Sequence, residues 1–426
     1  MRCSAVAATA SLPTPIQLTQ LESAERKRVK SLYEALGAHP DKELRVLFEK
    51  SQRVFDEIAT RHLPRWVVTF SGGKDSTLTA LLAVDYLATM DSPPHLDIVY
   101  SDTLLEIPAM RRAAGSFLHY LRKFGTMEAL PIRVRVVRPK VDDRFWVRMI
   151  GKGYPPPKPK FRWCTRRLKI TPAASSVTNG KPTAVLTGVR YGESTQRTGR
   201  LVASCTTGGE CGQDYWAQSG PTGSNITYFA PIIEWKTCKV WDFLHFVAPR
   251  AGWPTQDVYA LYGDTSLRFG CWTCTLVRRD KTMEALVARD PRSPLAELNK
   301  FRNEILVESA LHKNRLWRRN HWAGLRIEFR QQLLGRLKTL ERSTGMQLLS
   351  REEEFEIRRL WVEYLAHKRG PKPKGSHKSA LTQRVASSNG LPWPSPTRTG
   401  HADVWRAQPA VEDHRAAPIG NDPLPR

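Results

Sequence analysis

The chain has 426 residues, and its 66 lysines and arginines exceed its 41 aspartates and glutamates, which gives a formal net charge of +25. Such a length corresponds to two or three domains, and 41% hydrophobic with 25% charged residues excludes a wholly disordered chain. No apolar run approaches the ~18 residues of a membrane-spanning helix, and the first residues are too weakly apolar for a secretory signal. We therefore expect a cytoplasmic protein with no membrane partner, and the positive charge favours nucleic acid as a partner.

Hydrophobic periodicity predicts the secondary structure in chain order. Residues 13–63 repeat apolar residues at helical spacing, which predicts one or two helices ahead of the main domain. Beyond them, short apolar runs alternate with helical segments: strands are expected at 66–70, 96–100, 132–137 and 184–188, and helices at 77–90 and 110–124. This alternation predicts an α/β fold with a doubly wound parallel sheet, whose ligand lies at the carboxyl ends of the strands.

The remaining segments complete the domain plan. The proline- and glycine-rich stretch 151–161 is expected to be a loop, and residues 368–426, which hold nine of the 30 prolines, a disordered tail. We therefore predict four parts: a helical extension (1–63), the main domain (64–285), a basic helical region (286–367) and the tail (368–426).

The segment Ser71–Ser76 reads Ser-Gly-Gly-Lys-Asp-Ser and lies between a predicted strand and a predicted helix. Two glycines let the backbone approach a ligand closely, and the amides at a helix start point at negative oxygens. Lys74 adds a positive charge. The spacing differs from the Walker pattern. We interpret the segment as a phosphate-binding loop; an ordinary turn with a serine helix cap is the alternative.

Seven cysteines in 426 residues are too few for a disulfide framework, so we expect metal-binding, catalytic or buried thiols. Cys271 and Cys274 have the CxxC spacing that places two sulfurs on one metal or cluster. A redox pair, half of a zinc site or coincidence remain open. Cys164 lies in a basic, aromatic segment, and Cys205 and Cys211 lie in a glycine-rich one.

Positive charge is concentrated in residues 131–170, where 13 lysines and arginines and two aspartates give +11. Basic residues beside aromatic ones suit phosphate backbones and stacked bases, so this segment predicts DNA or RNA binding. A merely solvated basic face is the alternative. The interleaved aromatic residues are Phe145, Trp146, Tyr154, Phe161 and Trp163.

The Ser71–Ser76 motif after a strand resembles the PP-loop of the adenine nucleotide alpha-hydrolase-like superfamily, which includes ATP pyrophosphatases and phosphoadenosine phosphosulfate reductases. The resemblance covers about residues 60–285. Within it, the chain is most similar to the DndC proteins of DNA phosphorothioation. The segments that carry this likeness are Ser101-Asp102-Thr103, Arg162 to Thr165 with Leu168-Lys169, Thr187 to Arg190 with Glu193, Ser194 and Arg197, and Phe269 to Thr275.

This resemblance implies a sulfurtransferase-type enzyme that uses ATP and Mg²⁺. An oxygen of the DNA backbone would be adenylylated with release of pyrophosphate, and sulfur would then displace AMP. A cysteine desulfurase and other subunits of a modification complex are the implied partners. The implied catalytic residues are Lys74, Lys169, Arg190 and Arg197. The implied cofactor-binding residues are Ser71, Gly72, Gly73, Lys74, Asp75, Ser76, Ser101, Asp102, Thr103 and Gly188, with Asp75 and Asp102 on magnesium or the ribose.

The resemblance also implies a four-iron cluster held by Cys164, Cys271 and Cys274. Asp264 stands where similar proteins carry another cysteine, so the fourth ligand would be Cys211 or Cys205, or the site would hold three cysteines or zinc. Three other functions remain open. A tRNA thiolase would share the loop and cluster. A sulfate-assimilation reductase is disfavoured because no cysteine follows Cys274 in this sequence. A non-catalytic nucleic-acid-binding subunit would keep the loop only as a nucleotide sensor.

Overall fold

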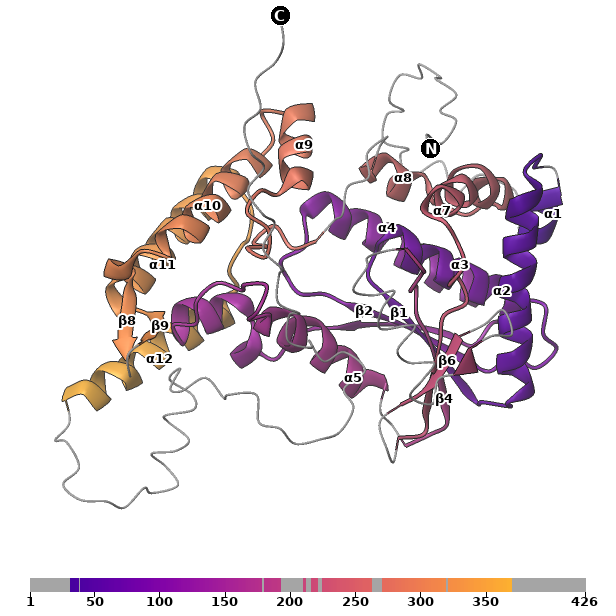
Figure 1. Cartoon of the computed structure of the whole chain (residues 1–426), viewed down its shortest axis with the longest axis horizontal. Helices are drawn as coiled ribbons and strands as arrows, with labels where there is room; N and C mark the ends of the chain where they lie inside the picture. Colours follow the sequence, from indigo (N-terminus) through magenta and orange to yellow (C-terminus); the bar gives the residue numbers. More distant parts are fainter. Residues whose placement is uncertain are drawn as a thin grey trace, which may run out of the picture.

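The computed structural model describes residues 31–37, 39–177, 180–192, 210–211, 216–220, 224–262, 270–318 and 321–369. Its centre is a seven-stranded sheet of order β3-β2-β1-β4-β7-β6-β5, in which the first five of these strands are parallel and the last two pair antiparallel (Figure 1). The strands are β1 (Arg65–Phe70), β2 (His95–Ser101), β3 (Ile132–Val137), β4 (Thr183–Leu186), β5 (Glu210–Cys211), β6 (Trp216–Ser219) and β7 (Ile226–Phe229).

The strand order creates a crevice for a ligand. From β1 the chain proceeds outward to β2 and β3, and it then returns to the opposite side of β1 as β4. The loops after β1 and β4 therefore diverge, and ligands of open α/β sheets bind at such a reversal, beyond the carboxyl ends of the strands. The four predicted strands and the predicted α/β fold class are confirmed.

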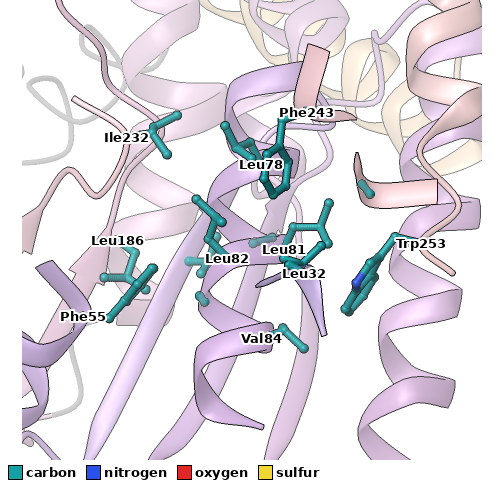
Figure 2. Packing of buried hydrophobic residues seen from close by; sticks show 14 of the residues in the cluster. Leu32, Phe55, Leu78, Leu81, Leu82, Val84, Leu186, Ile232, Phe243 and Trp253 are labelled. Carbon is teal, nitrogen blue, oxygen red and sulfur yellow. The ribbon is translucent and has the colours of Figure 1, made fainter. Parts of the chain in front are cut away.

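Helices cover one face of the sheet and bury the larger core. Trp66, Val68 and Phe70 of β1 point to this face, and the core extends from Phe55 to Trp253 (Figure 2). The predicted N-terminal extension belongs to it, because the ring of Phe55 stacks on Trp66 with centroids 6.0 Å apart. The helical segments on this side are α1 (Leu32–Gly37), α2 (Lys42–Thr60), α3 (Lys74–Leu87), α4 (Pro108–Met127), α7 (Thr237–Asp242), η5 (Phe243–Val247), η6 (Ala248–Ala251) and α8 (Gln256–Tyr262).

The other face of the sheet is packed by the short helix α5 (Thr171–Val177). Val67, Val99 and Val185 form a small apolar cluster with Val177 on this side. The guanidinium of Arg65 donates to the Val177 carbonyl over 2.7 Å, which fixes the end of α5 against the sheet.

The C-terminal part of the chain packs on the segment 141–170 (Figure 1, orange and yellow against magenta). The indole of Trp146 donates to the Leu348 carbonyl over 3.0 Å, and that of Trp361 to the Ile150 carbonyl over 2.9 Å. The predicted boundary between residues 285 and 286 therefore runs through a shared core. The elements are η2 (Val141–Asp143), η3 (Val147–Gly151), η4 (Thr165–Ile170), α9 (Lys281–Arg289), α10 (Leu295–Glu308), η7 (His312–Asn314), β8 (Arg315–Arg318), β9 (His321–Leu325), α11 (Ile327–Thr344) and α12 (Arg351–Arg369).

Two predictions from the sequence need adjustment here. The region 286–367 is not purely helical, because β8 and β9 form an antiparallel hairpin with Trp317 opposite Trp322. The predicted loop at 151–161 is confirmed beyond the end of η3 at Gly151. Helix α12 extends through Arg369, two residues into the predicted tail, and the rest of that tail lies outside the described residues. None of the helices in the described ranges combines the length and apolarity that a bilayer crossing requires.

Candidate functional site

The loop between β1 and α3 has a backbone that only glycine permits. Gly72 has φ +77°, and a Cβ at this position would lie 2.8 Å from the Cβ of Ala114 on α4. Gly73 is the N-terminal cap residue of α3 and has no side chain to satisfy the helix amides. The first turn of α3 therefore has no capping side chain, and a helix N-terminus of this kind favours an anionic ligand.

The two serines of the motif shape this loop. The hydroxyl of Ser76 accepts a hydrogen bond from the Ser71 amide at 3.1 Å and donates to the Gly73 carbonyl over 2.9 Å. The hydroxyls of Ser71 and Ser76 lie 3.1 Å apart. Both predicted serines thus face the inside of the turn and hold it closed around its own backbone.

Asp75 joins two of the predicted cations. Its carboxylate accepts from Lys74 Nζ at 2.8 Å and from Arg190 Nε at 2.6 Å. Arg190 is buried and also donates to the Trp235 carbonyl over 2.8 Å. Sequence reasoning placed these residues together, and the structure brings them beside the loop from α3 and from the segment after β4.

Gly188 lies against the first turn of α3. A Cβ at Gly188 would approach the Asp75 carbonyl carbon to 2.9 Å and the Ser76 amide nitrogen to 3.0 Å, so the β4 loop and α3 touch backbone to backbone. Sequence reasoning missed Tyr262, whose hydroxyl bonds to the Lys74 backbone. Burial, with the charge of Asp75, raises the pKa of Tyr262 to about 12. Its hydroxyl therefore occupies one amide that an anion would use.

Asp102 organises the turn after β2. Its Oδ1 accepts from Arg111 at 2.7 Å and from the Leu104 amide at 3.0 Å, and its Oδ2 accepts from Arg138 at 2.9 Å. Burial alone would raise the pKa of Asp102, but the two arginines outweigh it and hold the pKa below its ordinary value. Both carboxylate oxygens accept hydrogen bonds, so Asp102 positions two cations beside this turn. Ser101, also predicted, is the last residue of β2.

The three predicted cluster cysteines converge beside this turn. Cys271 Sγ lies 3.5 Å from Thr103 Oγ1, and the Cys274 amide donates to the Cys271 carbonyl over 3.0 Å. Burial, reinforced by Cys271, raises the pKa of Cys164 to about 11. The charge of Cys271, with those of Glu106, Cys164 and Cys274, raises the pKa of Lys169 against the opposing effect of desolvation. The ammonium group of Lys169 thus faces all three thiols.

Arg302, which sequence reasoning also missed, holds the CxxC turn from α10. Its guanidinium donates to the carbonyls of Cys274 over 2.7 Å and of Arg278 over 2.8 Å. No group of three or more His, Cys, Asp or Glu side chains in the described ranges is close enough to bind a single metal ion. Cysteine thiolates are the usual ligands of iron–sulfur clusters, and Cys164, Cys271 and Cys274 are half-buried thiols of that donor type.

The remaining predicted site residues divide into two groups. Arg197, Cys205 and Asp264 lie outside the described residues. Cys211 is in β5, and four strands separate β5 from β2 in the sheet. From β2 to β5 there are thus five spacings between neighbouring strands, each of about 4.8 Å, which separate the two strands by roughly 24 Å. Cys211 is therefore not placed to complete the thiol site.

The basic segment 131–170 is less available than its composition predicts. Seven of its 13 cations form ion pairs: Arg133 and Arg135 with Asp97, Arg138 with Asp102, Arg144 with Glu352, Arg148 and Arg167 with Asp143, and Lys152 with Asp142. Phe145, Trp146 and Trp163 are buried in the C-terminal core. The expectation that these rings stack on nucleic-acid bases is therefore wrong.

The glycine-bearing loop at the reversal of strand order defines an α/β protein of the PP-loop class. Residues 65–277, half of the chain, match the family model of the phosphoadenosine phosphosulfate reductase domain. The chain belongs to this family, as the sequence motifs predicted.

Two curated relatives are proteins of Methanocaldococcus jannaschii. "Uncharacterized protein MJ0973" is 25% identical over 207 residues, which are 48% of this chain and 40% of the relative. "Uncharacterized protein MJ0066" is 25% identical over 241 residues, 56% of this chain and 38% of the relative. The chain thus spans about two fifths of these relatives. The crystal structure of phosphoadenylyl-sulfate reductase from Candida auris, a phosphate complex, aligns with a TM-score of 0.32 at 17% identity, over 55% of this chain and 97% of that one.

Proposed function

We propose that this chain is an ATP-dependent sulfur-inserting enzyme whose Ser71–Ser76 loop binds the triphosphate, with Mg²⁺ as counter-ion. The observation that carries the proposal is that the loop and the three cysteines share one edge of the sheet. The loop follows β1, Thr103 follows β2, and these two strands are direct neighbours. The hydroxyl of Thr103 lies 3.5 Å from Cys271 Sγ. A nucleotide in the loop would therefore lie near the thiols.

The chemistry has two displacement steps. An oxygen of the acceptor attacks the α-phosphorus of ATP, the bond from that phosphorus to the β-phosphate oxygen breaks, and pyrophosphate leaves. A sulfur nucleophile then attacks the activated centre, and AMP departs with the original oxygen. Lys74 and Arg190, joined by Asp75, would offset the negative charge that grows on the phosphates. Lys169 would offset negative charge at the thiols.

An iron–sulfur cluster, if bound, would use Cys164, Cys271 and Cys274 as ligands and would supply sulfur chemistry at this edge. The acceptor that fits best is nucleic acid, as in DNA phosphorothioation by DndC-like proteins. Four exposed cations, Lys158, Lys160, Arg162 and Arg166, flank Cys164 in the chain and would contact a phosphate backbone. A cysteine desulfurase is the proposed source of sulfur.

Sulfate assimilation on small nucleotides is the second candidate. Two observations favour it: the chain matches the phosphoadenosine phosphosulfate reductase domain, and internal ion pairs engage more than half of the cations in residues 131–170. A tRNA thiolase would differ from the first proposal in the acceptor alone. A non-catalytic subunit would bind ATP without releasing pyrophosphate.

The test is to incubate the anaerobically purified chain with ATP, cysteine and a cysteine desulfurase, and to add DNA, tRNA or phosphoadenosine phosphosulfate separately. We expect pyrophosphate release and sulfur incorporation with DNA. Lys74→Ala should lower the rate about a hundredfold. Lys300→Ala, an exposed lysine on α10, is the matched control and should leave the rate unchanged. With dithiothreitol added as the two-electron reductant, release of sulfite from phosphoadenosine phosphosulfate, with no pyrophosphate from ATP, would establish the second candidate instead.

A further inference from the structure

We propose that Glu106 supplies the fourth protein ligand of the thiol site, through its Oε2 atom, beside Cys164, Cys271 and Cys274. The inference rests on the cluster of the proposed function and assigns the ligand that the sequence leaves open. A carboxylate would thus take the place of a fourth thiolate.

The backbone places Glu106 next to the CxxC turn. Glu106 and Cys271 pair in an isolated antiparallel β-bridge, and the Trp272 amide donates to the Leu105 carbonyl over 2.9 Å. Side chains of directly opposed antiparallel residues project to the same side, with Cβ atoms about 5 Å apart. The carboxylate of Glu106 and the thiol of Cys271 therefore leave the backbone together.

Hydrogen bonds to one oxygen fix the orientation of the Glu106 carboxylate, and its other oxygen has no hydrogen-bond partner among the described residues. Glu106 Oε1 accepts from the Thr103 amide at 3.1 Å and from the Thr103 hydroxyl at 2.6 Å. The same hydroxyl lies 3.5 Å from Cys271 Sγ. Glu106 Oε2 is buried and, within the described part of the chain, has no hydrogen-bond partner. A buried carboxylate oxygen without a partner is costly, and a metal ion would satisfy it.

The surrounding charge fits this assignment. Lys169 interacts electrostatically with Glu106 as well as with all three cysteines, so one cation faces every proposed ligand. A cluster held by three thiolates and one carboxylate carries net negative charge, which a neighbouring ammonium group offsets.

Within the described ranges, the other donors considered are engaged or distant; Asp264 and Cys205 lie outside those ranges. Both oxygens of Asp102 are occupied by Arg111, Arg138 and the Leu104 amide. Cys211 lies in β5, roughly 24 Å from β2 across the sheet. If Glu106 served only to order the turn from Thr103, its Oε1 would suffice for that role.

The test is the metal content and spectrum of the whole chain, purified anaerobically and reconstituted with iron and sulfide. We expect about four irons per wild-type chain. Glu106→Ala should reduce this to about three and change the electron paramagnetic resonance spectrum of the cluster. Glu106→Cys should restore four irons with a visible spectrum shifted from that of the wild type. Glu128→Ala, an exposed glutamate after α4, and Cys238→Ala should behave like the wild type.

Each outcome has one meaning, provided that thermal unfolding shows the variants to be folded. Four irons and an unchanged spectrum in Glu106→Ala and Glu106→Cys, with loss of iron in Cys164→Ala, would overturn the role of Glu106 and leave the cluster intact. A folded wild type without iron would overturn the cluster of the proposed function, and the assignment of Glu106 with it.

Discussion

The phosphate loop and the thiol site lie on the same sheet edge, yet the chain builds them in different ways. The loop is one uninterrupted stretch, from the end of β1 into the first turn of α3. The thiol site combines Thr103 and Glu106, Cys164 and Lys169, and the CxxC turn, which Arg302 holds from α10. The loop therefore depends on local backbone conformation, whereas the thiol site depends on long-range packing of the C-terminal core.

We expect the largest effect from a substitution that disrupts the C-terminal core, on which the thiol site depends. Trp146 is 1% exposed and lies at the centre of the C-terminal core. Trp146→Ala should lower the free energy of unfolding by about 3–5 kcal/mol and loosen the thiol site. ATP affinity should change less than about twofold, because the loop packs on the other core. Denaturant unfolding, iron content and calorimetry measure the three quantities. Phe355→Ala, at a side chain 70% exposed, is the control and should stay within about 0.5 kcal/mol of the wild type.

A substitution at Gly72 should do the opposite: it should disturb the phosphate loop and leave the thiol site intact. Gly72→Ala puts a side chain at φ +77° and 2.8 Å from the Ala114 Cβ, so we expect a loss of about 2–4 kcal/mol and loss of nucleotide binding, with iron content retained. The control is Gly115→Ala on α4, the helix that carries Ala114. A Cβ at Gly115 would meet open space, so this substitution should stabilise the protein by about 0.5–1 kcal/mol. Equal ATP affinity in the two variants would break the proposed link between the loop conformation and binding.

Helix α3, which begins at the loop, carries a buried titratable group near its C-terminal end. Burial raises the pKa of Asp85 on α3 to about 6, although its Oδ1 accepts from the Leu32 amide. An aspartate with a raised folded pKa destabilises the protein as pH rises from about 4, its unfolded pKa, to about 6. Asp85→Asn should remove this pH dependence and raise the free energy of unfolding at pH 7 by about 1–2 kcal/mol. Urea unfolding of both proteins at several pH values in this range measures the free energy of unfolding. If that free energy varies with pH in Asp85→Asn as it does in the wild type, the assignment is contradicted.

The smallest expected effect sharpens the picture of the loop. The Tyr262 hydroxyl bonds to the Lys74 backbone, at an amide that a phosphate would use. Tyr262→Phe removes this competitor, so the affinity for ATP should rise by about two- to fivefold, which corresponds to one hydrogen bond of modest net value. Iron content should not change. Weaker ATP binding in Tyr262→Phe would instead mean that the hydroxyl contacts the nucleotide.

The same contrast explains what the sequence could and could not predict. Strand β1, the glycines and the start of α3 follow from local patterns, and the loop was predicted as one motif. The sequence also predicted the CxxC pair and Cys164, which the structure brings together. The partners Glu106 and Tyr262 carry no local signal, because their roles arise from contacts between remote segments.

Burial was the other quantity that composition could not provide. The aromatic residues in 131–170 look like a base-stacking surface in the sequence, but Phe145, Trp146 and Trp163 pack against the C-terminal helices. Five of the 13 cations in the same segment form ion pairs with Asp97, Asp102 and Asp143. A count of residue types cannot distinguish a core from a surface when the partner elements are more than a hundred residues away.

Titration of the folded wild-type chain with ATP and Mg²⁺ by isothermal calorimetry, beside Gly72→Ala and Gly115→Ala, tests the assignment of the loop most directly. We expect saturable binding at one site per chain for the wild type and Gly115→Ala, and binding weaker by about a hundredfold or more for Gly72→Ala. A folded wild type that takes up no ATP, or a folded Gly72→Ala that binds as tightly as the wild type, would contradict the loop as the nucleotide site.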